Sequence, residues 1–82
     1  VNRVVPGDQL EAEVRDYALR MAECAPLTLA AHKIAIRAAM RPAAERNLDH
    51  LQELVRRCFD SDDYKEGVAA FLEKRKPTFR GR

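Results

Sequence analysis

Residues 61–82 read SDDYKEGVAAFLEKRKPTFRGR, and this stretch predicts a helix with a defined start and a defined end. Either Asp60 or Ser61 can cap the first turn, where acidic side chains also favour the positive end of the helix dipole. Apolar side chains then recur on one helical face, at Tyr64, Val68, Phe71 and Leu72. Pro77 ends the helix, so its last turn is expected to hold Lys74, Arg75 and Lys76 beside the negative end of the dipole.

Three further helices are expected before this one. Asp8, with Glu11 three residues later, resembles a capping box and opens a helix that ends near Cys24. Pro26 suits the first turn of a second helix, which Pro42 ends. A third helix runs from about Ala43 to Phe59. The sequence therefore predicts an all-α fold of about four amphipathic helices with short links.

The first residues have a different pattern. Val1 to Pro6 is rich in β-branched side chains and ends in the turn pair Pro6-Gly7. We expect a short strand remnant and linker at residues 1–7, with the partner strand lying outside this chain. A helical domain at residues 8–76 and a basic extended tail at residues 77–82 complete the expected organisation.

The chain of 82 residues is short for a self-sufficient fold. A domain of this size buries only about 60% of the surface that its unfolded form exposes, and such domains often need a disulfide, a metal or a partner. Cys24 and Cys58 each lie in an apolar helical stripe, so reduced core or interface residues are favoured over a disulfide or a metal site. The expected stabiliser is therefore another protein surface.

The formal net charge of +2 is concentrated at one end. Residues 73–82 carry five lysine or arginine side chains and one glutamate, so the preceding residues are acidic overall. A nucleic-acid duplex requires many cations spread over a surface. We therefore expect no nucleic-acid partner, and the short tail better fits one phosphate-bearing ligand. No apolar run approaches the ~20 residues of a membrane span, and no secretory leader is expected.

Catalytic and metal-binding motifs are not found in the sequence. Glycine-rich phosphate loops, serine elbows and Cys-x-x-Cys pairs do not occur. His32 and His50 have no spacing typical of a shared metal site, and a helix surface is the simpler interpretation. Asp60, Asp62 and Asp63 do not follow the ligand pattern of a calcium loop, and helix capping explains them better. We expect no metal.

One arrangement indicates a ligand. Phe71, Lys74 and Arg75 are spaced i, i+3 and i+4, which places an aromatic ring and two cations on one side of a helix. At the edge of a cleft they could cover an apolar group and hold a phosphate beside it. A core phenylalanine next to an ordinary basic helix end is the alternative.

The last 22 residues closely resemble the ends of enoyl-CoA hydratases of the crotonase family. The shared features are an acidic helix start, Glu66-Gly67, Ala70-Phe71, Glu73-Lys74-Arg75, Pro77, Phe79 and Gly81. Val1 to Pro6, the break at Ala25-Pro26-Leu27 and Lys33 are also similar to the family. The resemblance implies that this chain is the C-terminal segment of a crotonase-fold enzyme, and a start at Val1 fits a fragment.

The family resemblance carries several functional expectations. The parent enzyme would act on acyl-CoA thioesters, most simply by adding water to a 2-enoyl-CoA, with coenzyme A as part of the substrate and no other cofactor. Its catalytic glutamates and oxyanion-hole amides would precede Val1, so this chain alone is expected to be inactive. The C-terminal helices would join the missing N-terminal catalytic core, assemble a trimer-based homo-oligomer and close over the acyl-CoA site. A cytoplasmic enzyme is implied, with an organelle matrix as the alternative.

Two residues are assigned a binding role by the same resemblance. Phe71 matches a family aromatic that packs against CoA or its acyl chain, and Lys74 matches a lysine that meets a CoA phosphate. A second family aromatic falls on Val55, where the aromatic is not kept. A free-standing helical interaction module without catalytic activity is the alternative function, and a nucleic-acid-binding bundle is a more distant one.

Overall fold

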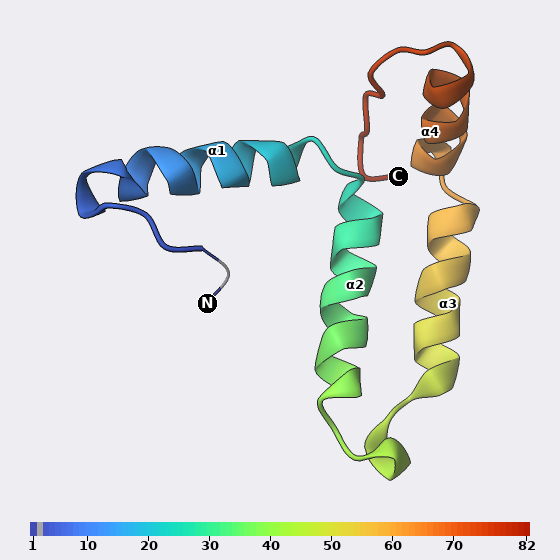
Figure 1. The fold of residues 1–82 in the computed structure, drawn as a ribbon. Coiled ribbons are helices and arrows are strands. Elements are labelled where there is room, and N and C mark those ends of the chain that lie inside the picture. Colours follow the sequence, from blue (N-terminus) through green and yellow to red (C-terminus); the bar gives the residue numbers. More distant parts are fainter. Residues whose placement is uncertain (2) are drawn as a thin grey trace.

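The computed structural model describes Val1 and residues 3–82, and within them it is all-helical (Figure 1). The helices are α1 (Leu10–Ala22), α2 (Pro26–Ala39), α3 (Leu48–Phe59) and α4 (Asp62–Leu72). Two single 3₁₀ turns, η1 (Gly7–Gln9) and η2 (Ala43–Glu45), precede α1 and α3. The expected all-α class with four helices is therefore confirmed for this part of the chain.

The helices form an open, flat arrangement. α2 and α3 lie side by side and run in opposite directions, and α4 continues beyond the end of α3 (Figure 1). The C-terminal tail then turns back to the start of α2, where Gly81 lies against Pro26. α1 projects away from this group at a steep angle (Figure 1).

The N-terminal strand remnant expected at residues 1–7 is not formed in the described residues. Val1 and residues 3–6 have no strand geometry, and Gly7 already belongs to η1; Asn2 lies outside the described residues. A strand exists only when its backbone pairs with a neighbouring strand, and no strand occurs in the part of the chain that the structure describes. Arg3 instead forms an ion pair with Glu13 of α1, with 2.6 Å between Nη1 and Oε1.

The cap predicted for α1 is wrong. Asp8 lies inside η1, Gln9 occupies the N-cap position, and no side chain caps the helix. The reason is the extra 3₁₀ turn, in which the Gln9 N–H donates to the Pro6 carbonyl at 2.9 Å. Because Asp8 already lies within helical backbone, it does not occupy the flanking position from which a carboxylate can cap.

The third helix begins five residues later than predicted. After Pro42 the chain makes only η2, becomes extended at Arg46, and enters α3 at Leu48. Asn47 caps α3 by accepting the His50 N–H at 3.1 Å. The Arg46 guanidinium donates to the carbonyls of Arg41 and Ala39 at 3.0 and 3.1 Å, which pairs oxygens left open at the end of α2.

The described residues do not enclose a hydrophobic core of their own. Their radius of gyration is 16.3 Å, against about 12 Å for a compact domain of this length. Ala31 and Ala70 are the only buried apolar residues within the described ranges, and no large side chain there is fully buried. The apolar stripe of α1 is exposed along its length, at Leu10, Val14, Tyr17 and Met21. Across the described residues, no helix combines the length and the apolar character needed to cross a membrane.

Candidate functional site

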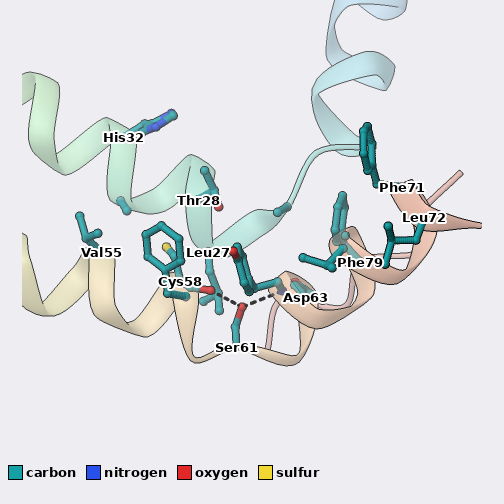
Figure 2. A pocket seen from close by; sticks show the side chains of 16 residues that line it. Leu27, Thr28, His32, Val55, Cys58, Ser61, Asp63, Phe71, Leu72 and Phe79 are labelled. Carbon is teal, nitrogen blue, oxygen red and sulfur yellow. Dashed lines mark hydrogen bonds between the residues drawn. The ribbon is translucent and has the colours of Figure 1, made fainter.

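A pocket of about 510 Å³ lies where α2, α3, α4 and the tail come together (Figure 2). Its wall is almost entirely apolar, which suits a hydrocarbon group better than a polar one. Val55 of α3 lies at one end of the pocket, and Phe71 and Leu72 of α4 lie at the opposite end (Figure 2). The lining also includes Leu27, Thr28, Ala31, His32, Cys58, Phe59, Tyr64, Gly67, Val68 and Phe79.

Ser61 fixes the junction between α3 and α4 at the base of this pocket. Its hydroxyl donates to the Cys58 carbonyl at 2.6 Å and accepts the Tyr64 N–H at 3.1 Å (Figure 2). Of the two caps left open by the sequence, the structure therefore selects Ser61, and Asp60 remains on the C-terminal side of α3. The rings of Phe59 and Tyr64 pack across the same junction with centroids 5.0 Å apart.

Asp63 anchors the tail to the start of α4. Its carboxylate accepts the backbone N–H groups of Arg80 and Gly81, each at 2.7 Å, and its own N–H donates to the Arg82 carbonyl at 2.9 Å. The side chain is buried, and these two bonds compensate for removing its charge from water. Gly67 lies one turn further along α4, directly beneath the Phe79 ring.

Phe71 is the most exposed large apolar residue in the second half of the chain. It lies in the last turn of α4 with 83% of its surface accessible, and Leu72 beside it is 74% exposed. The alternative in which Phe71 is a core residue is therefore wrong for this chain by itself. A ring this open to solvent at the end of an apolar pocket is free to contact a ligand or another protein surface.

The end of α4 differs from the prediction. The helix stops at Leu72 and not at Lys76, because Lys74 adopts a left-handed conformation with φ of 54°. The Arg75 N–H then donates to the Ala70 carbonyl at 3.0 Å and the Lys74 N–H to the Phe71 carbonyl at 3.3 Å. This pair of bonds is the Schellman motif, which normally has glycine at the left-handed position. A lysine there costs roughly 1–2 kcal/mol of backbone strain.

Arg75 turns back along α4 to Glu66. Its guanidinium donates to both carboxylate oxygens, at 2.9 and 2.8 Å, and the Thr78 N–H donates to the same carboxylate at 2.7 Å. The hydrogen bond from Arg75, followed by that from Thr78, lowers the pKa of Glu66 to about 2. The same carboxylate raises the pKa of Arg75 further above its already high value.

Only one of three consecutive cations is left without an anionic partner in the described part of the chain. Arg75 pairs with Glu66 and Glu73, and Lys76 pairs with Glu23 at 2.7 Å. Lys74 is exposed and forms no ion pair there. The predicted helical face shared by Phe71, Lys74 and Arg75 is therefore wrong, because the helix ends before both cations and Arg75 is engaged internally.

The other predicted residues are placed as follows. Val55 lines the pocket and is half exposed, so a position at which the resembled family carries an aromatic does face this space. His32 is exposed at the pocket edge, whereas His50 lies at the start of α3. Cys24 and Cys58 are free thiols, the first exposed and the second half-buried. Within the described residues, no three histidine, cysteine or acidic side chains lie close enough to hold a metal ion.

Sequence reasoning missed the two carboxylates that organise the tail. The sequence pattern explains Asp63 only by helix capping and by the helix dipole, and it includes Glu66 only as part of the family resemblance. Their partners lie nine to nineteen positions later, beyond the reach of helical spacing. The one available indication was Gly67 within a helix, because an isolated helical glycine often marks the close approach of another segment.

The sequence and the structure of this chain are similar to those of known proteins. Residues 1–82 match the family model described as enoyl-CoA hydratase/isomerase. The chain belongs to the enoyl-CoA hydratase/isomerase family. Methylmalonyl-CoA decarboxylase of Escherichia coli is 40% identical over 84 residues, covering 99% of this chain and 32% of that protein. The 2,3-dehydroadipyl-CoA hydratase of the same organism is 35% identical, covering 100% of this chain and 32% of the relative.

Solved structures of the family contain the same helical arrangement. A probable enoyl-CoA hydratase/isomerase from Mycobacterium abscessus superposes with a TM-score of 0.82 at 34% identity, covering 100% of this chain and 32% of the other. The chain thus spans about a third of the length of the relatives that it matches. The predicted membership of the enoyl-CoA hydratase (crotonase) family is therefore confirmed.

Proposed function

We propose that this chain is the C-terminal segment of an acyl-CoA enzyme of the family, where it helps to assemble subunits and closes over the acyl-CoA site. The similarity of residues 61–82 to the ends of family members supports the placement. The exposed stripes of α1 and α4 support an assembly role, because covering a side chain such as Phe71 or Leu72 stabilises by about 1.5–3 kcal/mol. The surfaces that cover them would be the catalytic core and neighbouring subunits of a trimer-based homo-oligomer.

The complete coding sequence tests this placement directly. Because the relatives are about three times as long as this chain, roughly two thirds of the coding sequence should precede Val1. Two suitably placed glutamates in that part would favour hydratase chemistry. A coding sequence whose additional length follows Arg82 would contradict the C-terminal placement.

The proposed reaction of the whole enzyme is the addition of water to a 2-enoyl-CoA, with coenzyme A as part of the substrate and no separate cofactor. Addition of water to a 2-enoyl thioester generates a thioester enolate, and so does loss of carbon dioxide from a methylmalonyl thioester. Backbone N–H donors that stabilise the enolate oxygen would serve either reaction. The hydratase and decarboxylase names among the relatives are therefore compatible with one shared site. The expected location is the cytoplasm, with an organelle matrix as the alternative.

The binding role is proposed for Phe71 and Lys74. The observation that carries it is the contrast between Lys74, which has no anionic partner in the described residues, and its two paired neighbours, next to a ring that is 83% exposed. Phe71 would pack against the CoA moiety or the acyl chain. The Lys74 ammonium would bind a phosphate of CoA through a charge-assisted hydrogen bond.

Replacing Lys74 by alanine in the complete enzyme tests the phosphate contact. Loss of one charge-assisted contact costs about 1.5–3 kcal/mol, so the Michaelis constant for the CoA ester should rise by roughly 10- to 100-fold. The turnover number should change little, because the phosphate lies far from the reacting carbons. Lys65→Ala removes an exposed lysine from α4, the helix that ends just before Lys74, and should leave both constants unchanged. An unaltered Michaelis constant in Lys74→Ala would refute the contact.

A further inference from the structure

The backbone at Lys74 is held in a conformation that its own side chain does not favour. A left-handed residue at the end of a helix is normally glycine, and lysine has no short polar group with which to stabilise this conformation locally. Such strain persists only where surrounding contacts enforce it, and it is concentrated at functional sites. The contacts next to Lys74 are therefore of functional interest.

The Glu66 carboxylate supplies these contacts from inside α4. It binds the Arg75 guanidinium through two hydrogen bonds and the Thr78 N–H through a third. Arg75 directly follows Lys74, so the fork-shaped ion pair fixes the chain immediately after the left-handed residue. The Schellman bonds from Lys74 and Arg75 fix it from the other side.

A second anchor lies one turn earlier on the same side of the helix. Asp63 holds the amides of Arg80 and Gly81, and the Phe79 ring packs over Gly67. Ala70, next along this side, is only 1% exposed. The tail is thus attached to α4 at both ends of residues 75–82, and the attachment leaves Lys74 at the exposed bend.

The ion pairs of Arg75 and Lys76 also determine which cation of the bend is available to a phosphate. Arg75 pairs with Glu66 and Glu73, and Lys76 pairs with Glu23, so in the described residues the Lys74 ammonium is the one cation of this bend without an ion-pair partner. One compact cation held on a fixed turn recognises a phosphate more selectively than several mobile ones, because less side-chain and backbone freedom is lost on binding.

We propose that Glu66 and Arg75 are positioning residues, whose ion pair fixes the turn that directs the Lys74 ammonium toward a phosphate of the bound CoA thioester. This inference rests on the proposed function, because it requires that Lys74 meet a phosphate. Neither Glu66 nor Arg75 touches the ligand. Their effect on affinity passes through Lys74.

Equilibrium binding to the complete, assembled enzyme tests the inference. Calorimetry would compare CoA with pantetheine, which is the same thiol arm without any phosphate. Lys74→Ala should weaken CoA binding by roughly 10- to 100-fold. Glu66→Gln should weaken it by about three- to tenfold, and should add nothing further in the Lys74→Ala background, because two residues that act through one contact are not additive. Pantetheine affinity should be the same in all variants.

The matched control is Glu53→Gln. Glu53 forms a similar fork-shaped pair with Arg56 on α3, in which Nη2 donates to Oε1 at 2.7 Å and Nε donates to Oε2 at 3.1 Å, and it has no hydrogen bond to the tail in the described residues. Its loss should leave CoA affinity unchanged. Arg75→Lys keeps the charge but loses the fork, so its CoA affinity should fall between those of the wild type and Glu66→Gln.

The outcomes separate the two proposals. If Lys74→Ala leaves CoA affinity unchanged, the phosphate contact in the proposed function is wrong, and the positioning role falls with it. If Lys74→Ala weakens CoA binding but Glu66→Gln does not, only the positioning role is wrong. Equal losses for CoA and pantetheine in Glu66→Gln would show a purely structural role. Tighter CoA binding in that variant would show that Arg75, once released, binds the phosphate itself.

Discussion

At the scale of single residues, Asp63 and Glu66 show how a few carboxylates organise a segment without forming an active site. Each accepts two or more hydrogen bonds from the tail, and each lies on the side of α4 that the tail covers. Both are engaged by backbone N–H groups, which are present whatever the side chain. The amides of Thr78, Arg80 and Gly81 therefore need only the two acids to hold them, whereas the pairing of Glu66 with Arg75 depends on the arginine side chain.

Glu66 should make stability depend on pH in the acid range. Its pKa in the folded chain is about 2, below the value of about 4.3 for an unfolded chain, so its ionised form favours folding. That contribution is complete above about pH 4.5 and is lost as the pH falls toward 2. Urea unfolding of the complete enzyme and of Glu66→Gln should show a stability difference that narrows over this interval. A difference that stays constant from pH 5 to pH 2 would contradict the role of the ionised carboxylate.

Residue-scale prediction from sequence succeeded where the chemistry is local. Ser61 was one of the two caps expected, because a hydroxyl can reach an N–H three residues ahead. The pairing of Arg75 with Glu66 was missed, and Lys74 and Arg75 were wrongly placed on the face of Phe71. Both errors have one cause, since the chain leaves the helix at Lys74 and helical spacing no longer applies.

At the scale of elements, the helix boundaries depend on the type of residue that marks them. The breaks at Pro26 and Pro42 were predicted, because proline acts through its own ring. The end of α4 was placed four residues late, because a lysine carried the left-handed position and Pro77 was the first recognisable stop. The late start of α3 reflects the extended backbone at Arg46, which no local residue indicates.

The cap at the α3–α4 junction gives an element-scale prediction. Ser61→Ala removes the acceptor for the Tyr64 N–H and the donor to the Cys58 carbonyl, and it should destabilise the complete enzyme by about 1 kcal/mol. Chemical denaturation measures the change. Asp8→Ala serves as the control, because Asp8 caps no helix here and its loss should stay within about 0.5 kcal/mol. Equal effects of the two substitutions would contradict the assignment of the cap.

At the scale of the whole molecule, the open shape fits a chain that spans only about a third of the length of its relatives. Ala31 and Ala70 are the only buried apolar residues among those described, so the proposed role expects other surfaces to cover the apolar stripes of the chain. The sequence predicted this dependence from size alone, since short chains bury too little surface. The placement of α1 relative to the other helices could not be predicted, because within the described residues α1 makes few contacts with them.

The isolated 82-residue chain should therefore neither melt cooperatively nor catalyse hydration of crotonyl-CoA. Its helices lack a common core, so heating followed by circular dichroism should give a broad, non-cooperative loss of helix. Sedimentation should show self-association through the exposed apolar stripes. A sharp transition in a concentration-independent monomer would instead support the free-standing interaction module, and retained turnover would contradict the placement of catalysis elsewhere.

The thickness of the chain has a practical consequence for studying the whole enzyme. The structure is 45 × 41 Å across but only 17 Å deep, and one helix with its side chains already measures about 10–12 Å. In the described residues every backbone amide therefore lies within about one helix of water, and local opening of the helices sets its exchange with deuterium in the isolated chain. Amides of this region that exchange more slowly in an intact enzyme than in the isolated chain would then identify the helix faces that another surface covers.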